Sequence, residues 1–175
     1  LSMAVVNDRQ VIWSEGFGYA DRKGRVPATS ATRYRIGSLT RLFTATAVMQ
    51  LVELGGLELD QPVQASIPEF SVRTRYGPAR PITIRDLLTH HSGLPSTILK
   101  GAGSRRPAHF SDILKRMKEE YALFPPGYIF SASPVDSTLA GIIIERVTGR
   151  DYRSYLRDEV FLPLGMETTD IMAVD

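Results

Sequence analysis

The 175-residue sequence contains no cysteine. The chain therefore forms no disulfide and offers no thiol for nucleophilic, redox or zinc-binding chemistry. Long apolar runs are also lacking: the longest uncharged apolar block, residues 139–144, is far shorter than the roughly 18 residues that a membrane-spanning helix needs. The start of the sequence shows no signal-peptide pattern. We therefore expect no membrane span in this chain.

An excess of charge of one sign is lacking as well. There are 21 Lys and Arg residues against 19 Asp and Glu residues, a net charge of +2. The basic residues form no stripe with interleaved aromatics, so nucleic acid is not an expected partner. No spacing of His, Asp and Glu indicates a metal site, and nothing implies a cofactor. The apolar fraction of 43% and charged fraction of 23% are typical of a globular protein, and we expect one domain over residues 1–175.

Strand patterns are confined to the N-terminal third of the chain. Residues 3–6 and 10–13 are β-prone runs separated by the turn residues Asn7 and Asp8, which predicts a hairpin. Residues 21–32 read as a polar loop, and residues 34–36 as a short strand. A single hairpin is only marginally stable, so we expect further strands of the sheet to lie outside this chain.

Helix patterns fill the remainder. The predicted helices cover residues 38–54, 84–90, 111–123, 134–147 and 152–160. In the first of them an apolar stripe that we expect to be buried consists of Leu42, Phe43, Ala45, Met49 and Val52. Residues 96–108 read as a loop. Strands followed by helices, without βαβ alternation, indicate the α+β class.

Local cap signals mark several of these helices. Thr83 and Asp86 have the spacing of a capping box, and Asp151 can cap the last helix. Ser133, followed by Pro134 and Asp136, reads as an N-cap, an N1 proline and an N3 acid.

Ser38 opens the first long helix pattern, with Arg41 three residues later. The backbone N–H groups at a helix start are unpaired and lie at the positive end of the macrodipole. That position suits a nucleophile that must stabilise negative charge. Residues at i and i+3 share one helix face, so Ser38 and Arg41 lie together. A serine before an apolar helix can also be no more than an N-cap.

Four blocks in order resemble the serine β-lactamase and penicillin-binding-protein family, in its class C and esterase branch. They are VIWSEGFGYADRKGRVPATSATRYRIGSLTRLFTATAVMQLVELGGLELDQPV, ITIRDLLTHHSGLP, FPPGYIFSASPVDSTLAGIIIERVTGRDY and PLGMETT. The resemblance runs along nearly the whole chain. It implies a β-lactamase/transpeptidase-like fold, in which a helical lobe packs against an antiparallel sheet. Members are longer, so the resemblance implies an N-terminal portion here, with the later strands and third motif absent. By analogy it also implies a periplasmic or exported protein.

The resemblance assigns positions to the catalytic motifs. Family members use Ser-x-x-Lys, which Ser38 and Arg41 match, so Ser38 occupies the nucleophile position and Arg41 the lysine position. The second motif is Tyr-x-Asn, and its positions fall on Ala132 and Pro134. An arginine guanidinium stays protonated at neutral pH and cannot act as a base, although it can stabilise an oxyanion. It can equally point away from the serine and pair with a carboxylate. Ala132 carries no proton-transfer group, and only the Ser133 hydroxyl remains nearby as a weak catalytic candidate.

Two functions therefore stay open. The first is a serine hydrolase of the β-lactamase, DD-peptidase or esterase type, acting on a small amide or ester through a Ser38 acyl-enzyme. The second is a catalytically impaired relative that serves as a binding or scaffold module, for which the C-terminal half of the fold is a candidate partner. His90 and His91 suggest a Ser–His dyad, but the sequence identifies no Asp partner, and the matching turn in the family is structural.

Overall fold

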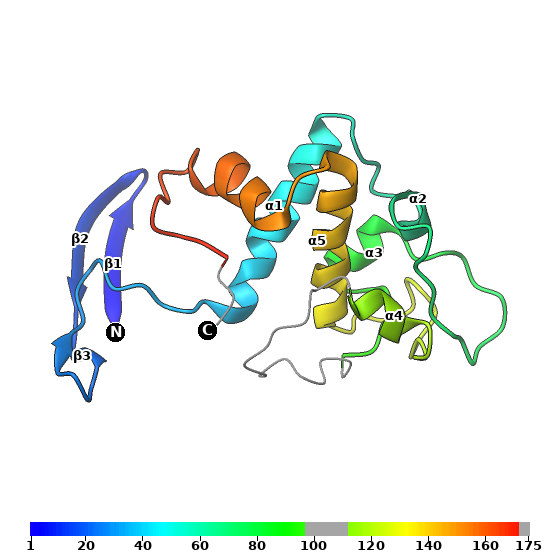
Figure 1. Ribbon diagram of the computed structural model, residues 1–175, viewed down its shortest axis with the longest axis horizontal. Coiled ribbons are helices and arrows are strands. Elements are labelled where there is room, and N and C mark those ends of the chain that lie inside the picture. Colours follow the sequence, from blue (N-terminus) through cyan, green and yellow to red (C-terminus); the bar gives the residue numbers. More distant parts are fainter. Residues whose placement is uncertain (97–111, 172–175) are drawn as a thin grey trace. The chain divides into compact units, whose positions relative to one another are not determined.

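The computed structural model describes residues 1–96 and 112–171 (Figure 1). The chain forms two compact units, residues 1–37 and residues 38–175, and each is described by itself. The strands belong to the first unit and the α-helices to the second. The predicted loop over residues 96–108 lies almost wholly outside the described residues.

The first unit is built on the predicted hairpin, which the structure confirms. Strand β1 (Ser2–Asn7) pairs antiparallel with β2 (Gln10–Gly16), and Asn7 lies opposite Gln10. Asp8 in the turn has φ 49°, a left-handed conformation that Asp tolerates better than most residues. Gly16 at the end of β2 must be glycine, because a Cβ there would lie 2.4 Å from the backbone of Ala28.

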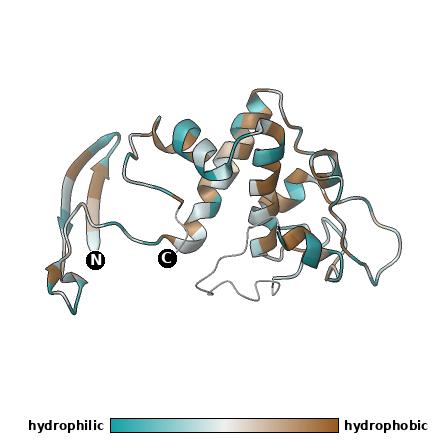
Figure 2. Cartoon of the chain, viewed as in Figure 1, coloured by the Kyte–Doolittle hydropathy of each residue, from teal (hydrophilic) through white to brown (hydrophobic). Residues whose placement is uncertain are grey.

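Both faces of this hairpin carry exposed hydrophobic side chains, which Figure 2 shows as brown segments along β1 and β2. The exposed residues are Met3, Val5, Val6, Val11, Ile12 and Trp13. Two strands alone cannot enclose a core, which is why these side chains stay open within the unit.

Two expectations for the first unit are wrong. The predicted loop over residues 21–32 contains a second small hairpin, in which β3 (Tyr19–Asp21) pairs with β4 (Val26–Pro27). Residues 34–36 form no strand, since no other strand of the unit pairs with them. Instead the Tyr34 hydroxyl lies 3.1 Å from Ser2 Oγ.

The second unit consists of helices. In chain order they are the 3₁₀ turn η1 (Gly37–Leu39), α1 (Thr40–Glu53), α2 (Val63–Ser66), α3 (Ile84–Thr89), α4 (Ile113–Met117), α5 (Pro134–Thr148), α6 (Tyr152–Leu156) and the π-helical turn η3 (Arg157–Phe161). Among the described residues, no helix is long and apolar enough to cross a bilayer.

The predicted apolar stripe of α1 is only partly buried. Phe43 and Val52 pack against the core as expected, whereas Leu42 and Met49 are exposed. The most buried residues of the helix are Thr44, Ala47, Val48 and Leu51. Apolar residues occur on several sides of α1, so periodicity alone did not select the face that packs.

Cap predictions are confirmed at three other helices. Thr83 and Asp86 form a complete capping box at α3, and the Asp151 side chain accepts a hydrogen bond from the Ser154 N–H at α6. Ser133 caps α5, which ends at Gly149 with φ 66°. In contrast, the helix predicted over 111–123 ends at Met117, the last residue of α4. The chain then turns so that Tyr121 forms a bridge with Arg73 from a distant segment.

Helix α5 forms the centre of the core and packs against α1 and α3 (Figure 1). Its residues Leu139, Ile142, Ile143 and Ile144 are almost completely buried. Burying a side chain of this size contributes about 1.5–3 kcal/mol. Phe43 of α1 meets Phe161 edge to face, with ring centroids 5.1 Å apart. This packing fixes the start of α1, and therefore Ser38, against the ends of α3 and α5.

Candidate active site

Ser38 lies in the turn η1, directly before α1. Gly37 precedes it with φ 53°, a conformation that glycine adopts without strain and that directs the chain into the helix. The Ser38 side chain is exposed and makes no hydrogen bond to any other described residue. The hydroxyl is therefore accessible, and no described group receives its proton in this conformation.

The N-terminus of α1 has no side-chain cap, because Leu39 occupies the N-cap position. Helices α3, α5 and α6 are all capped by a side-chain oxygen. No side chain therefore occupies the N–H groups at this helix start, and the positive end of the helix dipole lies beside Ser38. Such donors can stabilise an oxyanion that forms on a carbonyl attacked by this serine.

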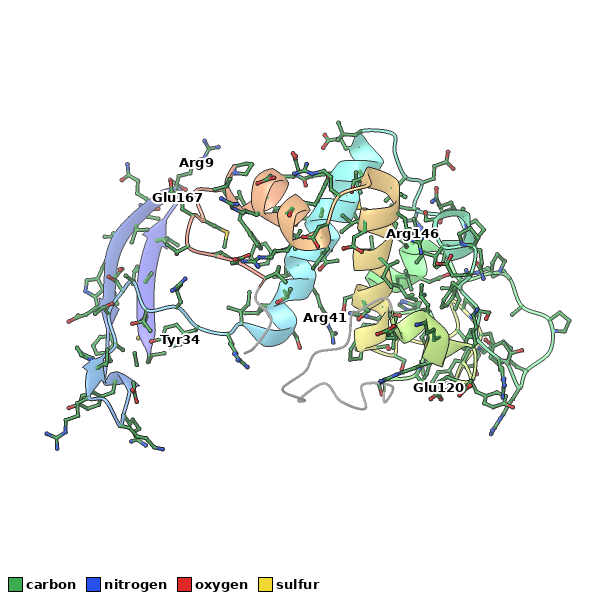
Figure 3. All side chains as sticks on the ribbon, viewed as in Figure 1. Arg9, Tyr34, Arg41, Glu120, Arg146 and Glu167 are labelled. Carbon is green, nitrogen blue, oxygen red and sulfur yellow. The ribbon has the colours of Figure 1, made fainter. Side chains whose placement is uncertain are left out.

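Arg41 lies one turn beyond Ser38 and is partly buried. Figure 3 shows its side chain leaving α1 on the side that faces α5. It lines a cleft of about 40 Å³ between α1, α3 and α5, together with Thr44, His90 and Asp136. Within residues 1–96 and 112–171, the guanidinium has no carboxylate or carbonyl partner. Arg41 thus faces into the unit and is not paired with a surface acid there.

His90 and Asp136 form a hydrogen-bonded pair at this cleft. His90 is the C-cap of α3 with φ 59°, and its Nδ1 lies 2.9 Å from Asp136 Oδ2. The Ser92 hydroxyl donates to the other carboxylate oxygen at 2.5 Å. The Asp136 side chain is fully buried, and 20% of the His90 side chain is exposed. Nδ1 is the ring nitrogen that this pairing uses, and Nε2 is not part of it.

Burial raises the pKa of Asp136 above its ordinary value, although hydrogen bonds from His90 and Ser92 act to lower it. The pKa of Asp86, a second buried carboxylate in this unit, is shifted in the opposite direction. Burial acts to raise its pKa, but the bonds from Arg80 and Thr83 outweigh burial and hold the pKa below its usual range. The two carboxylates differ because only Asp86 has a guanidinium partner.

The segment that resembles the second motif is built into the start of α5. The buried Ser133 hydroxyl donates to Pro95 O at 2.9 Å and accepts from the Val135 N–H at 3.1 Å. The N-cap prediction for Ser133 is therefore confirmed, and a role in proton transfer would require its hydroxyl to give up the bond to Pro95 O. Pro134 begins the helix, and Ala132 is exposed with no polar group.

Sequence reasoning missed the Asp136 partner of His90. The two residues are 46 positions apart, and Asp136 was interpreted only as an N3 acid. One sequence signal could have found this pair. Ser133 already caps α5, so the Asp136 carboxylate is not needed as a cap and can bind a donor from a distant part of the chain. Among the described residues, no three of His, Asp and Glu gather as a metal site would require. A larger hollow of about 420 Å³ is lined mainly by residues between Phe70 and Ile82, and includes neither Ser38 nor Arg41.

The fold is that of β-lactamases and penicillin-binding proteins, as comparison with solved structures shows. A penicillin-binding protein homologue from Pyrococcus abyssi is 36% identical, with a TM-score of 0.79, and the match covers 94% of this chain and 39% of that one. EstCE1, described as a hydrolase with promiscuous acyltransferase activity, is 26% identical with a TM-score of 0.82, over 94% of this chain and 46% of its own.

The family model described as Beta-lactamase matches residues 1–173, and the chain belongs to that family. It is 32% identical to Protein flp of Staphylococcus aureus (strain MW2), over 96% of this chain and 34% of that protein. The chain thus spans about a third of the length of this curated relative. The expected α+β, β-lactamase-like fold class is confirmed. The chain contains only part of that fold, since it covers 39% of the Pyrococcus abyssi homologue.

Proposed function

We propose that this chain carries the nucleophile-bearing part of a serine hydrolase, in which Ser38 attacks an amide or ester carbonyl. The observation that carries the proposal is the exposed, unbonded Ser38 hydroxyl at the uncapped start of α1. The family and a neighbour described as a hydrolase with acyltransferase activity support the same chemistry. The substrate is a small molecule, and by analogy the site works in an exported protein.

In the proposed reaction the Ser38 oxygen bonds to the carbonyl carbon and releases the amine or alcohol. The N–H groups of the first turn stabilise the oxyanion, and water then hydrolyses the acyl-enzyme. The proton of Ser38 passes to solvent, because Arg41 is already protonated and Ala132 has no acceptor. Positioned bases contribute about 10²–10⁴-fold to such reactions, so we expect slow acylation.

A fluorophosphonate probe tests this proposal on the intact chain. We expect covalent mass to be added once per chain, and to be lost completely in Ser38→Ala. Ser14→Ala removes another exposed serine and serves as the matched control, with labelling unchanged. If the folded wild-type chain acquires no adduct, the proposed hydrolase activity through Ser38 is excluded.

The second candidate is a catalytically impaired module that binds a ligand or the remainder of the fold. The observation that favours it is the commitment of Ser133 to the cap of α5, beside Ala132 and Pro134. On this account a labelled penicillin binds reversibly or not at all, and no adduct forms at Ser38.

A further inference from the structure

The cleft beside Arg41 has features that acyl transfer does not use. Its volume of about 40 Å³ is close to the roughly 30 Å³ that one water occupies in the liquid, so it admits a single small group. Apolar walls come from Ala45, Leu87 and Leu88. The titratable residues among its lining are Arg41 from α1, His90 from the end of α3 and Asp136 from α5.

Arg41 supplies an uncompensated cation to this cleft. It is partly buried and has no hydrogen-bond or ion-pair partner among the described residues. Five other arginines of the same unit, Arg80, Arg85, Arg146, Arg150 and Arg153, all pair with carboxylates. Guanidinium groups bind carboxylates through two parallel hydrogen bonds, which is the interaction that Arg41 lacks here.

Asp136 does not satisfy this cation. Its oxygens are engaged by His90 Nδ1 and the Ser92 hydroxyl, and its side chain is fully buried. The His90 ring also lines the cleft, so a group that binds beside Arg41 lies next to this ring.

We propose that this cleft binds a carboxylate group, with the Arg41 guanidinium as the cation that receives it. Ser38 lies three residues before Arg41, about 5–6 Å along the helix. A carboxylate on Arg41 would therefore belong to a substrate whose acid group lies a few bonds from the carbonyl that reacts. That assignment to substrate rests on the proposed function, whereas binding of the carboxylate does not.

Sodium acetate is the probe, followed by NMR of the ring resonances of the chain's three histidines at matched ionic strength with sodium chloride. We expect a saturable shift of His90 with a Kd on the order of millimolar, while His91 and His109 do not saturate. Acetamide, which has the same shape without the charge, produces no saturable shift.

Four variants test separately how the charge of Arg41 and the volume of the cleft contribute to acetate binding. Arg41→Gln should weaken acetate binding at least about tenfold, since a charge-assisted pair is lost. Ala45→Leu fills the cleft without changing charge and should abolish binding. Arg9→Gln removes a charge from the exposed hairpin turn and should leave binding unchanged, as should Ser38→Ala, which abolishes acylation.

The outcomes distinguish this inference from the proposed function. Acetate binding without a Ser38 adduct keeps the carboxylate site and removes the hydrolase. An unshifted His90, or equal binding by Arg41→Gln in a chain whose other resonances are native, overturns the carboxylate site whether or not Ser38 is labelled.

Discussion

At the residue scale, the site combines an accessible serine with polar side chains that already hydrogen-bond to other residues. Ser38 makes no hydrogen bond to a described residue, whereas Ser133 makes two and Asp136 is bonded by His90 and Ser92. On the proposed function, reactivity therefore depends on Ser38 and the charge of Arg41. The hydroxyl and carboxylate groups around them hold the scaffold in place.

Ser133 provides the first prediction at this scale. Ser133→Ala should lower the free energy of unfolding by about 1–3 kcal/mol, because it removes the cap of α5 and leaves Pro95 O without its donor. Urea unfolding measures the change. Ser71→Ala, at an exposed serine of the same unit, should stay within about 0.5 kcal/mol. A negligible change at Ser133 with loss of Ser38 labelling would instead support a catalytic role.

Asp136 gives a pH dependence whose sign follows from burial. Its pKa is raised in the folded chain, so the stability due to the protonated carboxyl is complete below about pH 3.8 and is lost as the pH rises through the folded pKa. Asp136→Asn removes this titration. The free energy of unfolding of wild type, measured relative to Asp136→Asn, should therefore fall as the pH rises from about 4 towards neutrality.

Asp86 is the matched comparison, since it is also buried but has a lowered pKa. Its contribution is present above about pH 3.8 and is lost as the pH falls through the lower folded pKa. The free energy of unfolding of wild type, measured relative to Asp86→Asn, should therefore fall as the pH is lowered. This trend is the reverse of that expected for Asp136. Two series with the same slope would contradict the assigned pKa directions.

At the element scale, short helices are fixed by their caps. Helix α3 begins at the Thr83–Asp86 capping box, and Arg80 binds Asp86 through two bonds of 2.6 and 2.8 Å. The same helix ends on His90 in the left-handed conformation, so its N-terminal cap helps to place a residue of the cleft.

Asp86→Ala should lower the free energy of unfolding by about 2–3 kcal/mol, a value reduced because Arg80 is half exposed and regains water. Asp60→Ala breaks a pair with Arg85 that is exposed on both sides and should change stability much less. Thermal or urea unfolding compares the two variants, and equal losses would show that the capping box does not hold α3.

The sequence predicts elements where the determining residues are neighbours in the chain. The β1–β2 turn, the Thr83 box and the Ser133 cap are all decided within four residues, and all are confirmed. The buried face of α1 and the end of α4 depend on distant partners. Tyr121 pairs with Arg73, and the packing of α5 selects which side of α1 is buried. Periodicity carries no information on either.

At the scale of the whole molecule, the family follows from sequence blocks, and the same blocks predict that Ser38 occupies the nucleophile position. The cleft does not follow from them. The cleft unites residues of α1, α3 and α5, and His90 meets Asp136 across 46 positions. The chain comprises the hairpin unit and the helical unit that begins with Ser38, and it spans about a third of a curated relative's length. The activity of the whole protein therefore remains a proposal here.

Replacing Arg41 and Ala132 by the lysine and tyrosine of the family motifs tests how much these two side chains contribute to the activation of Ser38. Arg41→Lys combined with Ala132→Tyr should raise the rate of fluorophosphonate labelling of Ser38 at least about tenfold, because a tunable base and a hydroxyl return at the positions that the family resemblance assigns to them. Arg41→Lys with Ala132→Phe supplies the ring without the hydroxyl and should gain less. A double variant no faster than wild type would show that activation needs groups beyond these two.

The central claim is that Ser38 is a nucleophile, and locating the adduct tests it most directly. Trypsin cleaves after Arg35 and Arg41, which places Ser38 in the peptide of residues 36–41. After treatment of the intact chain with fluorophosphonate, we predict that fragmentation of this peptide assigns the added mass to Ser38 and not to Thr40. An unmodified peptide from a folded chain, or mass found only on another residue, would contradict the account.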